Sequence, residues 1–174
     1  MSKMKIAVGC DHIVTEIKTE VVKYLEKKGI EVMDCGTYDK ERTHYPIYGK
    51  RVGEKVALKE AELGIVLCGT GVGITNAVNK IKGIRCVLTQ DVSVVRYARE
   101  VLNANVLGFG GRVSGMGVIE DLIDAFLETE YAETEERNQM IEKIDHLIQH
   151  DPACGKENLF DDLLEKWERG EYHD

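Results

Sequence analysis

A cysteine that precedes a glycine-rich turn is the segment of this sequence best suited to chemistry. It reads Cys68-Gly69-Thr70-Gly71-Val72-Gly73 and follows the apolar run 63–67. Closely spaced glycines after a strand let backbone N–H groups converge on an anion, and a helix that starts there points the positive end of its dipole at the same place. A thiol beside such groups favours the thiolate, which can act as a base. The alternatives are a tight turn without a ligand and a buried cysteine that closes the strand; the spacing matches neither the dinucleotide fingerprint nor the P-loop.

Two polar residues, Asp11 and His12, follow the first apolar run of the chain. A carboxylate can accept a proton from a sugar hydroxyl, and an imidazole can donate to an anion such as phosphate. Asp11 can also cap the first helix, and His12 can simply be solvated. Arg42 and Tyr45 belong to a third polar stretch whose side chains can hydrogen-bond a sugar, although that stretch alone is typical of a surface turn.

Short apolar runs alternate with longer amphipathic runs over most of the chain, a pattern typical of strands alternating with helices. The expected strands are 6–8, 31–34, 63–67, 84–88 and 105–108; the expected helices are one through Ile17, Val21 and Leu25 that ends at Gly29, then 48–60, one from 74, 91–102 with Asp91 as N-cap, and 116–127. Such alternation predicts a parallel sheet with helices on both faces. Ligands bind beyond the carboxyl ends of such strands, where the segments with Asp11 and Cys68 fall.

The composition changes after residue 131. A charged helix is expected at 134–149, a turn at 151–152, and a short amphipathic helix through Leu164 and Trp167. We therefore expect a domain over 1–131 and a helical extension over 132–174 that packs on the body or on a partner.

Charge and composition narrow the class of function. With 174 residues, 43% of them hydrophobic, the chain can bury one substantial core. A formal charge of −8 argues against a nucleic-acid partner. The absence of a signal peptide and of an apolar run near the ~20 residues that span a bilayer predicts a cytoplasmic protein without a membrane partner. The five widely spaced cysteines are expected to be reduced thiols. No metal site is expected, and His146 and His150 are expected on an exposed helix face.

Taken together, these segments resemble the family that contains ribose-5-phosphate isomerase B and the two subunits of galactose-6-phosphate isomerase. The agreement is co-linear over about residues 4–131, which makes it more specific than any single motif. The matching segments are Gly9-Cys10-Asp11-His12, Gly36-Thr37-Tyr38, Arg42-Thr43-His44-Tyr45-Pro46, the cysteine segment, Asn79-Lys80, Gly83-Ile84-Arg85, Asn105-Val106-Leu107 and Gly108-Phe109-Gly110-Gly111-Arg112. Within the family, the end of the chain, residues 166–174, is most similar to the B subunits of galactose-6-phosphate isomerase.

The resemblance implies a Rossmann-like three-layer αβα fold and an isomerase without a metal or organic cofactor. Cys68 would move a proton between C2 and C1 of an open-chain sugar phosphate through an enediolate, whose oxygen the loop N–H groups would hold. Asp11 would assist ring opening, His12 would contact phosphate, and other side chains would position the sugar. The implied catalytic residues are Cys68, Asp11 and Thr70, and the implied substrate-binding residues are His12, Arg42, Tyr45, Gly69, Gly71, Val72, Gly73, Asn105 and Arg112.

Two departures from the family pattern imply a second chain. Ribose-5-phosphate isomerase B has a ring-opening histidine where this chain has Val101-Leu102, and phosphate-binding arginines near the segment that reads Glu133-Thr134-Glu135-Glu136-Arg137-Asn138 here. Because the family assembles its site between two subunits, the resemblance implies a companion A subunit that supplies the histidine and arginines; self-association is also expected. The implied reaction interconverts galactose 6-phosphate and tagatose 6-phosphate in lactose and galactose catabolism.

Two alternatives remain open. A homo-oligomeric isomerase of ribose 5-phosphate or allose 6-phosphate could use Arg112 or Arg137 for the phosphate. A non-catalytic sugar-phosphate-binding subunit would explain the missing histidine, although the intact cysteine segment argues against it.

Overall fold

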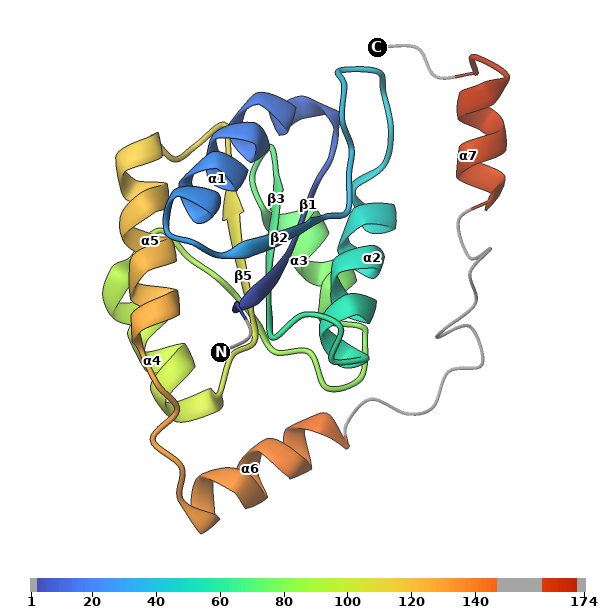
Figure 1. Cartoon of the computed structure of the whole chain (residues 1–174). Coiled ribbons are helices and arrows are strands. Elements are labelled where there is room, and N and C mark those ends of the chain that lie inside the picture. The colour runs from blue at the N-terminus through green and yellow to red at the C-terminus, as the bar shows by residue number, and fades with distance from the viewer. Residues whose placement is uncertain (1–2, 147–160, 172–174) are drawn as a thin grey trace.

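A five-stranded parallel sheet forms the central layer of the fold (Figure 1). The computed structural model describes residues 3–146 and 161–171. The strands are β1 Lys5–Cys10, β2 Glu31–Asp34, β3 Leu63–Cys68, β4 Cys86–Leu88 and β5 Val106–Gly110. They lie in the order β2-β1-β3-β5-β4. The parallel sheet predicted from the alternating pattern is confirmed.

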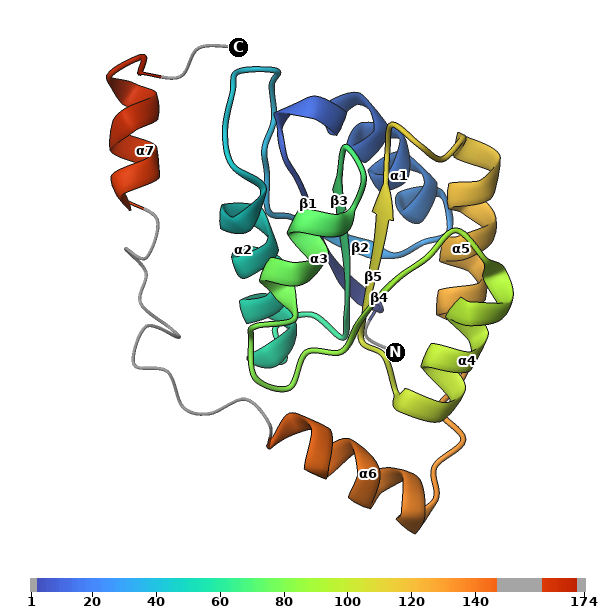
Figure 2. The same cartoon turned by 180° about the vertical axis from the view of Figure 1, so that it is seen from behind.

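Helices cover both faces of this sheet, which gives three layers (Figures 1 and 2). The helices of one face are α1 Thr15–Lys27, α4 Val92–Leu102 and α5 Met116–Glu128, and those of the other face are α2 Tyr45–Ala57 and α3 Val72–Val78. Two apolar cores result. The α1–α4–α5 core includes Ile6, Leu67 and Phe109, whereas the α2–α3 core includes Ala7, Val66 and Cys68. Neighbouring residues of a strand enter opposite cores because side chains alternate between the faces of a sheet.

Several element ends differ from the predicted ones for local reasons. Helix α2 begins at Tyr45 rather than at residue 48 because Pro46 in its first turn has a backbone angle preset for a helix. Helix α3 begins at Val72, directly after Gly71 in the left-handed conformation. Asp91 caps α4 as predicted, with its side chain accepting from the Ser93 N–H.

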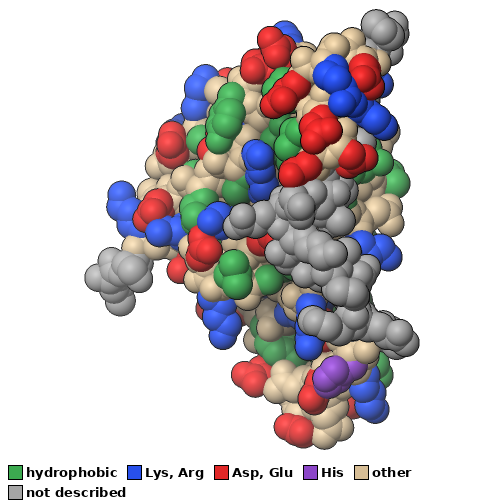
Figure 3. All heavy atoms as spheres, turned by 90° about the vertical axis from the view of Figure 1, so that its right-hand side faces the viewer, with side chains coloured by type: hydrophobic (Ala, Val, Ile, Leu, Met, Phe, Trp, Pro, Cys, Tyr) green, Lys and Arg blue, Asp and Glu red, His purple; other side chains and the backbone are tan. Residues whose placement is uncertain are grey.

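The chain beyond the sheet forms α6 Glu135–Asp145, which Thr134 caps, and α7 Asp161–Glu168. Leu164 of α7 packs against the α2–α3 core. The predicted end of the charged helix and the turn at 151–152 lie outside the described residues, as do His150 and Cys154. On the face shown in Figure 3, acidic and basic side chains are interspersed. None of the described helices is long and apolar enough to cross a bilayer.

Candidate active site

The register of the sheet places two predicted catalytic residues at the same level. Cys10 pairs with Leu67, and both face the α1–α4–α5 core. The next residues, Asp11 and Cys68, therefore stand side by side at the ends of β1 and β3 and face the α2–α3 layer. Cys68 pairs on its other side with Gly110 of β5. Since adjacent strands lie about 4.8 Å apart, three loops meet at this point of the carboxyl edge.

The sulfur of Cys68 lies inside the loop that the residue begins. Cys68 is 4% exposed, and the Gly71 N–H donates to its Sγ over 3.2 Å. The loop is fastened to the chain after β5, because the Gly111 N–H donates to the Cys68 carbonyl over 2.9 Å and the Arg112 N–H donates to the Gly69 carbonyl over 3.0 Å. A thiol in this position is held by a backbone donor and largely shielded from water.

Some backbone N–H groups of the cysteine loop donate to acceptors within the loop, and others have no acceptor in the part of the chain that the structure describes. The Gly71 N–H is used by the sulfur, and the Val72 N–H donates to Oγ1 of Thr70 over 3.4 Å. Within residues 3–146 and 161–171, no acceptor lies on the N–H groups of Gly69, Thr70 and Gly73. These groups are the backbone donors of the loop that could hold an oxyanion of a ligand, and those of Gly69 and Thr70 directly follow Cys68.

Gly71 is the position of this loop where a side chain is excluded both by the backbone conformation and by a neighbouring strand. Its φ is +82°, and a Cβ at this position would lie 2.6 Å from the carbonyl carbon of Phe109. Gly83 has nearly the same φ, +81°, but a Cβ there would meet nothing within 4 Å. The two positions separate backbone strain from steric overlap.

We expect Gly83→Ala to lower the free energy of unfolding by about 1–2 kcal/mol, the strain of a left-handed non-glycine residue. Gly71→Ala adds the overlap with Phe109, so we expect a loss of about 3 kcal/mol or more. Urea unfolding of both variants measures the difference. Equal losses would mean that the loop is not packed against β5 as described.

Asp11 caps a short helix in addition to standing beside Cys68. Its Oδ1 accepts from the Ile13 N–H over 3.1 Å and so caps the short 3-10 helix His12–Val14. The capping role foreseen as an alternative is thus present. Burial raises the pKa of the Asp11 carboxyl, while the Ile13 N–H and nearby His12 lower it by less. The second carboxylate oxygen can still accept a proton from a substrate hydroxyl.

His12 is held against the loop that precedes α2. Its Nδ1 accepts from the Thr43 N–H over 3.2 Å, which makes Nε2 the proton-bearing nitrogen of the neutral ring. Burial lowers the pKa of His44, and the charges of Arg42 and His12 lower it further. Asp162 opposes this lowering and Lys166 adds to it. Arg42, His12 and His44 therefore share one region, where the charge of Arg42 can attract a phosphate group.

Tyr45 contacts the far end of the cysteine loop. A Cβ at Gly73 would lie 2.6 Å from Cε2 of the Tyr45 ring. The phenol therefore packs directly on the backbone of Gly73, and the lack of a side chain there is what admits it. The predicted sugar-positioning residue Tyr45 is thus brought to the loop that carries Cys68.

Of two other predicted binding residues, Arg112 lies near the cysteine loop and Asn105 does not. Arg112 approaches the loop, with its Cδ 3.7 Å from the position of a Cβ on Gly69. Asn105 precedes β5 at the opposite edge of the sheet, about 16 Å from Cys68 at 3.3 Å per residue. Its side-chain oxygen accepts from the Arg85 N–H and its amide nitrogen donates to the Gly83 carbonyl. The structure therefore does not bring Asn105 to the other site residues.

The other described cysteines are free thiols in environments unsuited to proton transfer. Burial raises the pKa of Cys10 and of Cys86 to about 12, and that of Cys35 to about 11. These thiols stay protonated at neutral pH. Among the described cysteines, Cys68 is the one whose sulfur accepts a backbone N–H in a loop at the carboxyl edge.

Exposed apolar side chains surround this polar site. Ile13, Val72 and Val113 follow the ends of β1, β3 and β5, Leu88 is the last residue of β4, and each of the four is between 37% and 53% exposed. We call these four residues the apolar rim. A sugar phosphate offers such side chains little to bind, whereas a protein surface does.

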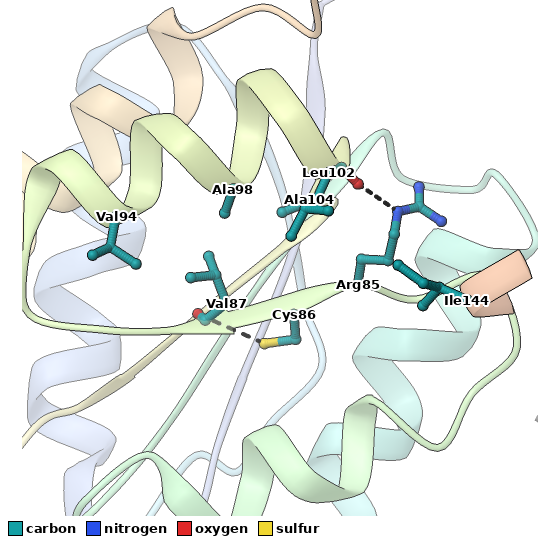
Figure 4. Close-up of a pocket in the computed structure, with 8 residues that line it drawn as sticks. All are labelled: Arg85, Cys86, Val87, Val94, Ala98, Leu102, Ala104 and Ile144. Atoms are coloured by element: carbon teal, nitrogen blue, oxygen red, sulfur yellow. Dashed lines mark hydrogen bonds between the residues drawn. The ribbon is translucent and has the colours of Figure 1, made fainter. Parts of the chain in front are cut away.

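An apolar hollow of about 260 Å³ lies between β4, α4 and the end of α6 (Figure 4), and neither Cys68 nor Asp11 lines it. Ile144 and Leu102 line it. The Arg85 guanidinium at its margin donates to the Asp145 carboxylate and to the backbone carbonyls of Gly83, Leu102 and Asn103. The hollow brings no catalytic group together.

Comparison with known proteins gives a consistent result. The model of the Ribose/Galactose Isomerase family matches residues 6–144. Galactose-6-phosphate isomerase subunit LacB of Clostridium acetobutylicum is 55% identical over 97% of this chain and 98% of its own. Ribose-5-phosphate isomerase B of Escherichia coli is 44% identical over 73% of this chain and 85% of its own. The structure of a ribose 5-phosphate isomerase from Thermotoga maritima superposes with a TM-score of 0.80 at 41% identity, covering 83% of this chain and 99% of its own.

Proposed function

Because the chain belongs to the ribose/galactose isomerase family, we propose that it is the cysteine-bearing subunit of an isomerase that interconverts galactose 6-phosphate and tagatose 6-phosphate. The observation that carries this proposal is the placement of Cys68 beside Asp11, in a loop that holds the Cys68 sulfur on the Gly71 N–H and leaves the Gly69 and Thr70 N–H groups without an acceptor among the described residues. The 55% identity to a galactose-6-phosphate isomerase subunit along nearly the whole chain supports the substrate.

The reaction begins with ring opening. A base removes the proton of the anomeric hydroxyl, the bond from C1 to the ring oxygen breaks, and an acid returns a proton to that oxygen. The Asp11 carboxylate takes the first proton, and its burial, which raises the pKa of this carboxyl, makes it a stronger base than an exposed aspartate. The acid comes from the companion chain.

Proton transfer at carbon follows in the open-chain sugar. The Cys68 thiolate removes the proton from C2, and the electron pair forms the C1–C2 double bond while negative charge moves to O1. The Gly69 and Thr70 N–H groups hold this enediolate. The Thr70 hydroxyl passes the proton of O2 to O1, and the Cys68 thiol returns its proton to C1, which gives the ketose.

The phosphate and the sugar are held by the loop before α2. The His12 Nε2–H donates to the phosphate, since Nδ1 is occupied by the Thr43 N–H. Arg42 adds positive charge in the same region. Tyr45, packed on Gly73, positions the sugar hydroxyls over the cysteine loop.

A companion chain is proposed from where the altered positions lie. Val101 stands at the C-terminal end of α4, away from the carboxyl edge where that helix begins. The segment that precedes α6 lies beside it, because the Ala132 N–H and the Arg137 guanidinium both donate to the Glu100 carbonyl. A histidine or arginine at these positions would lie at the end of α4 opposite the edge that carries Cys68, which supports a role in the site of a second chain.

The apolar rim supports the same proposal, since a chain docked over Ile13, Val72, Leu88 and Val113 would cover them and exclude water from the cysteine. The companion would carry the ring-opening histidine and phosphate-binding arginines that Val101 and the acidic segment replace here. Self-association of such pairs would complete the oligomer.

A homo-oligomeric ribose-5-phosphate isomerase is the second candidate, favoured by the 44% identity to the Escherichia coli enzyme. It requires Arg112 or Arg137 to bind phosphate. The Arg137 guanidinium donates to the carbonyls of Ala132 and Glu100, which leaves Arg112 as the stronger candidate of the two.

The reaction is tested by isomerising galactose 6-phosphate in D₂O with this chain and its companion. Proton transfer through an enediolate lets the base exchange with solvent, so deuterium is expected at C1 of tagatose 6-phosphate, read by NMR. Because the shielded thiol can also return its own proton, the mixture is left to cycle many times at equilibrium. No deuterium at C1 after such cycling would contradict the enediolate route, and turnover of ribose 5-phosphate but not of galactose 6-phosphate would contradict the substrate.

A further inference from the structure

A buried lysine on α1 lies close to the site without belonging to it. Lys18, Val21 and Leu25 are spaced as one helix face and are all buried. The Lys18 side chain is 3% exposed, and its Nζ donates to Oδ1 of Asp34 at the end of β2. The Asp34 side chain is 33% exposed, so the lysine is the buried partner of the pair. Burying a charged group in an ion pair adds little net stability compared with an apolar residue of the same size. The presence of this pair calls for another explanation.

The ion pair leads by two hydrogen bonds to the residue before Asp11. Asp34 Oδ1 also accepts from the Gly36 N–H over 2.9 Å. The Gly36 carbonyl accepts from the Cys10 N–H over 2.8 Å, and the Thr37 N–H donates to the Cys10 carbonyl over 2.9 Å. Both backbone groups of Cys10 are thus held by the turn that Asp34 begins.

The same turn leads to His12 by a second route. Gly36 has a φ of +91°, and a Cβ there would lie 3.0 Å from Cε1 of Tyr48. The Tyr48 hydroxyl oxygen is 3.0 Å from Oγ1 of Thr43, whose N–H donates to Nδ1 of His12. A shift of the turn would therefore move the backbone before Asp11 and the support of the His12 ring together.

Tyr38 closes the turn over the ion pair. Its ring centroid is 4.5 Å from Lys18 Nζ, a distance at which an aromatic face attracts a cation. Its hydroxyl donates to the Asp34 carbonyl over 3.0 Å. Lys18 therefore contacts the turn at two places, through the Asp34 carboxylate before it and through the Tyr38 ring at its end.

We propose that Lys18 is a positioning residue of the active site: by holding Asp34, it fixes the 36–38 turn and through it the places of Asp11 and His12. Lys18 touches no reacting atom. The kinetic consequence rests on the proposed function, whereas the structural consequence does not.

The test compares Lys18→Met with Lys5→Met. The Lys5 ammonium lies 2.9 Å from Glu31 and links β1 to the start of β2, at the end opposite Asp34, so Lys5→Met removes a lysine–carboxylate pair of the same strand without touching the 36–38 turn. In the enzyme assembled with its companion, Lys18→Met is expected to lower kcat by about 10- to 100-fold, as small misplacements of catalytic groups do, with KM changed by less than about threefold. Lys5→Met is expected to change either constant by less than about twofold.

Amide hydrogen exchange and the NMR signals of the His12 ring give a readout that needs no turnover. In Lys18→Met, the Cys10 and Thr37 amides are expected to exchange at least about tenfold faster than in Lys5→Met, and the His12 signals are expected to move. Unchanged exchange rates of the two amides together with unchanged His12 signals would overturn the inference. A failure of the assembled wild-type enzyme to isomerise galactose 6-phosphate would count against the proposed function alone, because these two measurements need no turnover.

Asp34→Asn keeps the shape of the side chain and an acceptor for Gly36, so it tests the same link if Lys18→Met does not fold. The exchange rates of Cys10 and Thr37 are expected to rise in this variant as well. Adding Lys18→Met to Asp34→Asn should change kcat by less than about twofold, because the two residues act through one contact. Independent, multiplying effects would show that Lys18 does not act through Asp34.

Discussion

Replacement of Cys68 by alanine is expected to lower kcat/KM for galactose 6-phosphate by about 10²–10⁴-fold in the enzyme assembled with its companion, the range in which a proton-transferring group contributes. The base is removed, whereas the Gly69 and Thr70 N–H groups and the phosphate contacts remain. Binding of the sugar phosphate, measured by calorimetry, should therefore change by less than about tenfold.

Cys35→Ala is the matched control for this result. Cys35 belongs to the same α2–α3 core and is also buried, but burial raises the pKa of its thiol to about 11, so it takes no part in proton transfer. We expect near wild-type turnover from it. Comparable turnover of Cys68→Ala and Cys35→Ala would contradict the role of Cys68 as base.

Asp11→Asn is expected to have opposite effects on activity and stability. Turnover should fall by about 10²-fold or more, because an amide cannot take the anomeric proton. The cap on the Ile13 N–H is retained, since asparagine caps as well as aspartate. Stability at pH 7 should rise, because the substitution removes a buried charge.

The sign follows from the direction of the Asp11 shift. Burial raises the pKa of this carboxyl above its value in the unfolded chain, so its contribution to stability is fully present below the unfolded pKa and is lost as the pH rises through the folded pKa. At pH 7 the ionised group therefore opposes folding. Urea unfolding at pH 7 should give a higher midpoint for Asp11→Asn than for wild type, and a lower midpoint together with full activity would refute this account of Asp11.

The strands and the cysteine loop could be predicted from local sequence. Buried parallel strands read as continuous apolar runs, and the glycines of the cysteine segment mark a turn that the structure explains at Gly71, where a left-handed φ and contact with Phe109 exclude a side chain. Pattern reasoning also identified Asp91 as the cap of α4. These features depend on neighbours in the chain.

Features that depend on register could not be obtained in this way. Asn105 stands in a matching segment, yet β5 begins after it, and this places the residue at the far edge of the sheet. The role of Lys18 was missed because it depends on an ion pair with Asp34, which lies on another element. A signal was available, since Lys18 occupies the helix face of Val21 and Leu25, where an unpaired lysine would be costly.

The division of the chain at residue 131 stays a prediction, and so does the part that the extension plays. Leu164 contacts the α2–α3 core, which agrees with packing of the extension on the body.

The central claim is that Cys68 of this chain works in a site completed by a companion chain. It is tested most directly by assaying galactose 6-phosphate isomerisation with this chain alone, with a homologous chain that has the histidine and arginines but no cysteine after its third strand, and with the two mixed, with ribose 5-phosphate in parallel. We predict activity on galactose 6-phosphate from the mixture alone. Turnover of ribose 5-phosphate by this chain by itself would contradict the claim, because the site would then be complete without a companion.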